Sequence, residues 1–179
     1  LGLYMILILL LHYWTPETHI DWDTVQLPDV HFPDTFAWGV ATASHQIEGG
    51  NTNNWSQFEE AKDLERSGDA CDHWNRWERD FDLIENLGVN HYRFSLEWSR
   101  IESSEGVWNE TAIEQYSNMI DDLISRNIEP MVTLHHFSHP IWFEDKGGFT
   151  NADNIDYWIR FSEKLFSVLG DRVKWWCTI

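Results

Sequence analysis

Two patterns of apolar and polar positions occur along residues 36–179. Four short stretches are almost continuously apolar and rich in aromatic or branched residues, which is typical of buried strands: 36–44, 91–100, 129–137 and 173–179. Between them, apolar residues recur every three or four positions, which predicts three helices: 72–88, 109–124 and about 153–169. The order β-α-β-α-β-α-β is typical of a parallel sheet covered by helices.

The spacing also predicts which side of each helix is buried. The expected inward residues are Trp74, Trp77, Phe81, Ile84 and Leu87 in the first helix, Ile113, Tyr116, Ile120, Leu123 and Ile124 in the second, and Ile155, Trp158, Ile159, Leu165, Phe166 and Leu169 in the third. Asp72 and Asn109 are suited to cap helix starts, and Gly88 and Gly170 to stop helices.

Two parallel-sheet architectures fit this order, the (β/α)₈ barrel and the doubly wound sheet. A nucleotide-binding doubly wound sheet is expected to carry GxGxxG or a P-loop, and the sequence has neither. Polar side chains instead gather at the carboxyl ends of the first three stretches: Gln46 just after the first, Glu97 with Arg100 at the end of the second, and His135 with His136 at the end of the third. Because barrel sites form at the carboxyl ends of the strands, we expect the first half of a (β/α)₈ TIM barrel, with four of its eight strands.

Arg93 is the unusual residue of the second predicted strand. A guanidinium cannot lose its charge, and burying it without an anion is unfavourable by several kcal/mol. Arg93 therefore lies at a solvent-exposed end of the strand or faces a carboxylate across a pocket. Simple alternation places Glu97 on the same side as Arg93, so a plain Arg93–Glu97 ion pair is the competing interpretation.

Three histidines, His135, His136 and His139, first suggest a metal site. However, residues 131–134 have strand character and Pro140 prevents a helix, so His135 and His136 point to opposite faces and do not readily share one ion. We therefore expect no metal. One of the two adjacent histidines should face a pocket and the other the helices, and periodicity alone does not decide which.

Composition narrows the function classes. The formal net charge of −18 repels phosphate backbones, so we expect no nucleic-acid partner. Twelve Trp residues supply rings that both pack and stack on sugars or bases. The two cysteines, Cys71 and Cys177, lack CxxC spacing and indicate neither a metal knuckle nor a redox pair.

The N-terminal 31 residues form a separate predicted region. Residues 1–11 are uncharged and apolar, too short for a membrane span of about 20 residues but suited to the apolar part of a secretory signal or an anchor. A buried strand and translated noncoding sequence are the alternatives. Residues 12–33 are expected to be an extended lead-in. The sequons at Asn54 and Asn109 agree with the secretory pathway, a cytoplasmic location stays open, and so does membrane association.

Six groups of residues in order along 32–179 resemble glycoside hydrolase family 1, the β-glucosidase family. The groups are FP at 32–33 with FAWGVATAS at 36–44, HQIEG at 45–49, YRFS at 92–95 with WSR at 98–100, VTLHHF at 132–137, KGGF at 146–149, and DRVK at 171–174 with Trp176 and Thr178-Ile179. The resemblance departs at His45, Phe137, Ser138-His139 and Phe149, which leaves the glycone preference open.

The resemblance implies a (β/α)₈ barrel that hydrolyses β-glycosides with retention, using two carboxyl groups and no cofactor. It implies that Gln46 and His136 bind hydroxyls of the sugar and that Arg93 contacts the nucleophilic carboxylate. It also implies that both catalytic carboxylates lie beyond residue 179, the first in an Asn-Glu-Pro motif directly after Ile179. The alternatives are an inactive, klotho-like binding protein and a membrane-associated glycolipid transglycosidase.

Overall fold

The computed structural model describes residues 2–14, 21, 24–26 and 31–179. The chain divides into two parts, residues 1–36 and 37–179. In the first part, helix α1 (Gly2–Trp14) has no buried residue. The predicted extended lead-in is wrong for residues 12–14, which belong to α1, and residues 15–20, 22, 23 and 27–30 of that lead-in lie outside the described residues. Among the described helices, none has the length and apolarity needed to cross a membrane.

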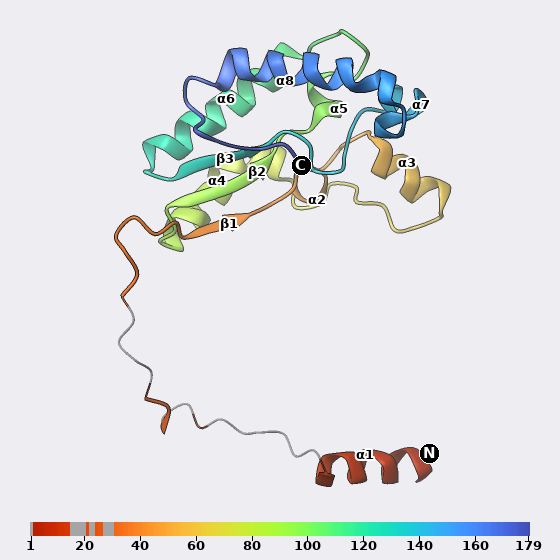
Figure 1. Cartoon of the computed structure of the whole chain (residues 1–179), viewed down its shortest axis with the longest axis vertical. Coiled ribbons are helices and arrows are strands. Elements are labelled where there is room, and N and C mark those ends of the chain that lie inside the picture. Colours follow the sequence, from red (N-terminus) through yellow and green to blue (C-terminus); the bar gives the residue numbers. More distant parts are fainter. Residues whose placement is uncertain (1, 15–20, 22–23, 27–30) are drawn as a thin grey trace. The chain divides into compact units, whose positions relative to one another are not determined.

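The second part contains a four-stranded sheet in which all neighbouring strands are parallel (Figure 1). The strands are β1 (Gly39–Ala41), β2 (His91–Ser95), β3 (Glu129–Thr133) and β4 (Trp175–Cys177). Their spatial order is β1-β2-β3-β4, so each new strand adds to the same edge. A doubly wound sheet reverses this direction partway, whereas a barrel does not. The predicted element order is confirmed.

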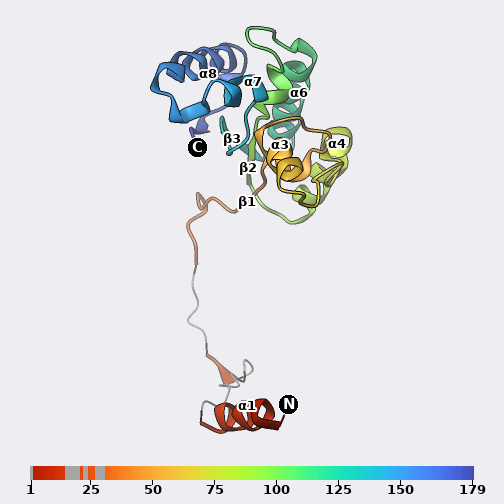
Figure 2. The same ribbon diagram turned by 90° about the vertical axis from the view of Figure 1, so that its right-hand side faces the viewer.

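One long helix connects each pair of strands: α4 (His73–Asn86), α6 (Glu110–Ser125) and α8 (Ile155–Leu169). Arg126, just after α6, forms ion pairs with Asp82 and Glu85 of α4, and Lys164 of α8 pairs with Glu110 of α6. The three helices therefore lie next to one another in chain order, as Figures 1 and 2 show.

Short helices occupy the loops. They are α2 (Ser44–Ile47), α3 (Asn54–Ala61), α5 (Trp98–Ile101), α7 (Ile141–Asp145), η2 (Gly148–Thr150) and η3 (Ala152–Asn154). Most of them follow the carboxyl ends of β1, β2 and β3, which is the end of the sheet where barrel sites form.

The strands are shorter than the sequence predicts, and the difference matters most in β2. The strand ends at Ser95, and Glu97 becomes the N-cap of α5, its side chain accepting a hydrogen bond from the backbone N–H of Ser99. Strand alternation therefore stops before Glu97 and does not decide on which side of the sheet its carboxylate lies.

The helix ends were predicted with mixed success. Asn109 caps α6 by accepting from the N–H of Ala112, as predicted. Gly88 follows α4 with a φ of 72°, a left-handed conformation that favours glycine. Asp72 precedes α4 but does not cap it, because its carboxylate binds the side chains of Asn75 and Arg76.

Most of the predicted inward residues are buried or partly buried, and the exceptions lie at helix ends or on a second face of α8. Leu87, just after α4, and Ile124, in the last turn of α6, are 66% and 42% exposed. Ile155, Ile159 and Phe166 are exposed by 49%, 46% and 44%. These three share a face of α8 rotated away from its buried residues, so the apolar surface of α8 is wider than its core contact.

Trp98 belongs to the hydrophobic core and is fully buried against α7 and α8. Its ring stacks on Phe161 with ring centres 4.6 Å apart and also contacts Phe143 and Trp158. The indole N–H donates to a carboxylate oxygen of Glu102, so the ring is buried without an unsatisfied donor. This packing fixes the chain immediately after β2, where Glu97 lies.

Candidate functional site

Gln46 and His136 lie on the same pocket, although they are 90 positions apart in the sequence. The cavity has a volume of about 440 Å³ and is also lined by Ala43, His45, Trp55, Glu59 and Phe137. Gln46 belongs to α2, directly after β1, and His136 follows β3. The pocket therefore forms at the carboxyl end of the sheet, where the sequence predicts a site.

The adjacent histidines face different surroundings. His136 lines the pocket, whereas His135 is 5% exposed and its ring contacts those of Phe149 and Trp158 among the helices. The sequence periodicity did not decide which of the two histidines faces the pocket, and in the structure it is His136. Burial, followed by the positive charge of Arg93, lowers the pKa of His136. The imidazole therefore favours its neutral form, which can both donate and accept a hydrogen bond.

His135 forms part of a chain of side chains that runs from the core to the surface. Its Nε2 lies 3.2 Å from Nδ1 of His139, whose Nε2 lies 2.7 Å from Glu144 Oε2. Burial, together with the two neighbouring histidines, lowers the pKa of His135 to about 4. Within the described ranges no three His, Cys, Asp or Glu side chains are placed to hold a metal ion.

Arg93 has no anionic partner among the described residues. The Nε atom of Arg93 is buried and makes no hydrogen bond, and no ion pair joins the guanidinium to a carboxylate in the described part of the chain. The competing interpretation of an Arg93–Glu97 ion pair is therefore not observed. An unneutralised, partly buried guanidinium is unfavourable, which makes Arg93 available to an anion that enters from outside these residues.

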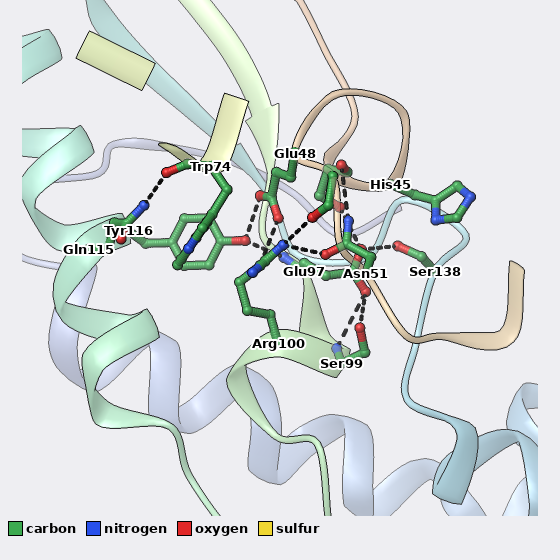
Figure 3. Close-up of polar contacts among 12 residues, drawn as sticks. His45, Glu48, Asn51, Trp74, Glu97, Ser99, Arg100, Gln115, Tyr116 and Ser138 are labelled. Atoms are coloured by element: carbon green, nitrogen blue, oxygen red, sulfur yellow. Dashed lines mark hydrogen bonds and ion pairs between the residues drawn. The ribbon is translucent and has the colours of Figure 1, made fainter. Parts of the chain in front are cut away.

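Glu97 is fully buried and is held by hydroxyl and amide donors (Figure 3). Its Oε2 accepts from Ser44 Oγ at 2.9 Å and from Ser138 Oγ at 2.8 Å. Its Oε1 accepts from Ser99 Oγ at 2.6 Å and from Asn53 Nδ2 at 3.3 Å. Both carboxylate oxygens are thus occupied, so Glu97 does not serve the pocket as a free acid or base.

A second buried carboxylate, Glu48, fixes the end of α2 (Figure 3). Its Oε2 accepts from Arg100 Nε at 3.1 Å, and its Oε1 accepts from the Tyr116 hydroxyl at 2.6 Å. The Arg100 guanidinium also lies 4.1 Å from the centre of the Trp74 ring. Burial and then the charge of Glu97 raise the pKa of Glu48 to about 7, against the opposing effects of Tyr116 and Arg100.

His45, beside Gln46, is held in one orientation. Asn53 Oδ1 accepts from the N–H of Ser56, so Asn53 Nδ2 faces His45 Nδ1 at a distance of 3.1 Å. Nδ1 must then accept, which places the proton on Nε2, 3.0 Å from Glu59 Oε1. Burial acts to raise the pKa of Glu59, but hydrogen bonds from Ser67 and His45 lower it overall.

The residues that hold the pocket-lining segments in place were not identified from the sequence. Glu48, Asn53 and Ser138 act through contacts with residues 41–68 positions away in the chain, which no local pattern reports. The one available signal was Asn53 followed by Ser56, the spacing of a helix cap, because the two side chains cap α3 reciprocally.

The family model described as glycosyl hydrolase family 1 matches residues 29–179. The chain is 40% identical over 159 residues to a 1,4-beta-D-glucan glucohydrolase of Thermotoga neapolitana, covering 83% of this chain and 37% of that protein. It is 39% identical to a human cytosolic beta-glucosidase, covering 83% of this chain and 34% of the relative. The chain therefore spans about a third of the length of these relatives.

Solved structures give the same result. A family 1 β-glucosidase from Thermotoga maritima superposes with a TM-score of 0.79 at 40% identity, covering 83% of this chain and 36% of that one. A beta-glycosidase from Pyrococcus horikoshii has a TM-score of 0.77 at 46% identity, with coverages of 81% and 34%. The predicted fold is confirmed: the four parallel strands are part of a (β/α)₈ barrel, and this chain belongs to glycosyl hydrolase family 1.

Proposed function

We propose that the complete protein containing this chain hydrolyses terminal β-D-glucosidic bonds with retention of configuration. The family membership and the β-glucosidase relatives support the reaction class. The observation in this chain that carries the proposal is that Gln46 and His136 line one pocket, while the neighbouring Arg93 has no anion among the described residues. The klotho-like and transglycosidase alternatives receive no support from the comparisons.

In this proposal Gln46 and His136 bind hydroxyls of the sugar whose bond is cleaved. A glutamine amide and a neutral imidazole each offer a donor and an acceptor, which matches the hydroxyl groups of a sugar. A site built to pair with a hydroxyl discriminates strongly against ligands that lack it, because its polar groups are then left unpaired.

Arg93 acts on the nucleophilic carboxylate rather than on the sugar. A guanidinium stabilises the ionised form of a carboxyl group and so lowers its pKa, and the ionised form is the nucleophile. The retaining reaction needs two carboxyl groups about 5–5.5 Å apart. We propose that both are supplied by the part of the protein that follows residue 179.

The test is hydrolysis of aryl β-D-glucosides by the complete protein, with product configuration followed by NMR at early times. We expect β-glucose to appear first, and aryl α-glucosides to be inert. Absence of turnover, or α-glucose as the first product, would refute the proposal.

We also propose that this protein enters the secretory pathway, with residues 1–11 as the apolar part of its signal. The helix α1 is apolar and exposes all of its residues, which suits recognition as a signal segment. Expression of the complete reading frame in cells, with and without residues 1–14, tests this. We expect the longer form in the medium or secretory organelles, and equal cytoplasmic distribution of both forms would contradict the proposal.

A further inference from the structure

We propose that Glu97 is a positioning residue that holds both walls of the sugar pocket, one carrying Gln46 and the other carrying His136. The inference rests on the proposed function and adds a residue to the same site. Glu97 itself does not line the pocket. It acts through the serine and asparagine side chains that bind its two carboxylate oxygens.

The first wall is the turn after β1. Ser44, two residues before Gln46, donates its hydroxyl to Glu97 Oε2, and its backbone N–H donates to Ser95 Oγ at 2.7 Å. Asn53 donates from a single amide nitrogen to Glu97 Oε1 and to His45. Glu97 is therefore connected to both residues that precede Gln46, to Ser44 directly and to His45 through Asn53.

The second wall is the segment after β3. Ser138, two residues after His136, donates to the same Oε2 that Ser44 binds. Phe137, which lies between His136 and Ser138, has a φ of 64°, a left-handed conformation that is strained for a residue with a side chain. Such a conformation persists only where the surroundings hold it, and the Ser138–Glu97 hydrogen bond is one of the contacts that do so.

The chemistry of Glu97 also favours a positioning role. It is fully buried, and no described cation forms an ion pair with it. Burying a carboxylate is unfavourable by several kcal/mol unless hydrogen bonds replace its water. Here the donors come from three segments, near residues 44–53, at residue 99 and at residue 138, so the hydrogen bonds that stabilise the charge also join the two walls.

The test uses the complete protein with Glu97→Gln and Ser138→Ala, and Ser162→Ala as the matched control. Glu97→Gln keeps the shape of the side chain but replaces one acceptor by a donor. Ser138→Ala removes one hydroxyl at the His136 wall. Ser162 is also a buried serine, but it bonds Trp158 O within α8, away from the pocket.

For Glu97→Gln we expect kcat/KM for an aryl β-glucoside to fall about tenfold or more, and for Ser138→Ala several-fold, with Ser162→Ala near wild type. The decisive readout is a series of monodeoxy β-glucosides. The variants Gln46→Ala and His136→Ala first identify which sugar hydroxyls these two residues bind. For an analogue that lacks one of those hydroxyls, we expect Glu97→Gln to lower kcat/KM much less than it does for the parent β-glucoside. A merely structural defect lowers kcat/KM equally for all substrates.

Equal losses on parent and deoxy substrates, or unchanged kcat/KM in Glu97→Gln, would overturn the positioning role while leaving the proposed function intact. An inactive wild type would instead overturn the proposed function. Should Glu97→Gln fail to fold, Ser44→Ala combined with Ser138→Ala gives the same comparison, since each removes one donor to Oε2 and leaves the carboxylate in place.

Discussion

His135 and His136 are neighbours in the chain, yet His135 packs against Phe149 and Trp158 while His136 lines the pocket with Gln46. The separation arises in the loop after β3, because the strand ends at Thr133 and the chain bends at His136 and Phe137. It places two histidines of identical chemistry in different surroundings, one among aromatic rings and one on the pocket where we propose that it binds the sugar.

The two histidines are therefore expected to respond oppositely to truncation in the complete protein. His136→Ala should lower kcat/KM for a β-glucoside by about 10- to 100-fold, because the site loses a hydrogen-bonding partner for a substrate hydroxyl, with little change in thermal midpoint. His135→Ala should lower the free energy of unfolding by about 2 kcal/mol, because it leaves a cavity among aromatic rings. Steady-state kinetics and urea unfolding of both variants check this, and the reverse pattern would contradict the assignment.

The raised pKa of Glu48 predicts a pH-dependent stability. In the folded state burial and the charge of Glu97 raise the pKa to about 7, while Tyr116 and Arg100 oppose the shift, whereas the ordinary value is 4.5. Between these values the folded carboxyl binds more protons than the unfolded one, so the contribution of Glu48 to stability decreases as pH rises from about 4.5 to about 7 and is level above.

A neutral replacement should remove this dependence. In Glu48→Gln the unfolding free energy, relative to wild type, is expected to be higher at pH 8 than at pH 5, by a few kcal/mol at most. Urea unfolding of the complete protein and the variant at both pH values measures it. A difference between the two proteins that does not change with pH would exclude a raised pKa at Glu48.

The order of the strands and helices could be predicted because each element carries its own signal. Residues such as Phe81, Tyr116 and Leu165 recur at helical spacing and are buried, and Asn109 caps α6 with its own side chain. A helix cap forms within one element, and burial of one apolar face is common to all of these helices, so both can be predicted from the spacing of residues.

The contacts that hold the site together could not be predicted, because they depend on the residue at which each strand ends. Glu97 has the parity of Arg93, but β2 stops at Ser95, and the carboxylate turns to Ser44 and Ser138 instead. The same limit applies to α8, where Ile159 is apolar but exposed, since spacing does not say how wide a surface the core covers.

Residues 1–179 alone are expected to be inactive. The strands β1 and β4 each pair on one side only within the described sheet, and Trp175 in β4 is 54% exposed, so the isolated chain presents sheet edges and apolar surface. We expect low solubility, no cooperative thermal transition and no hydrolysis of an aryl β-glucoside under conditions in which the complete protein is active. Measurable turnover by the purified chain would show that it contains a catalytic carboxylate after all.

Arg93 gives the most direct test of the whole account, because its guanidinium has no anion among the described residues and is proposed to hold the nucleophile. The measurement is kcat/KM of the complete protein for an aryl β-glucoside, compared with its Arg93→Gln variant. We predict a loss of about 100-fold or more, from removal of the charge that keeps the nucleophile ionised, with the thermal midpoint nearly unchanged. A variant within threefold of wild type would contradict the claim that Arg93 serves the catalytic carboxylate.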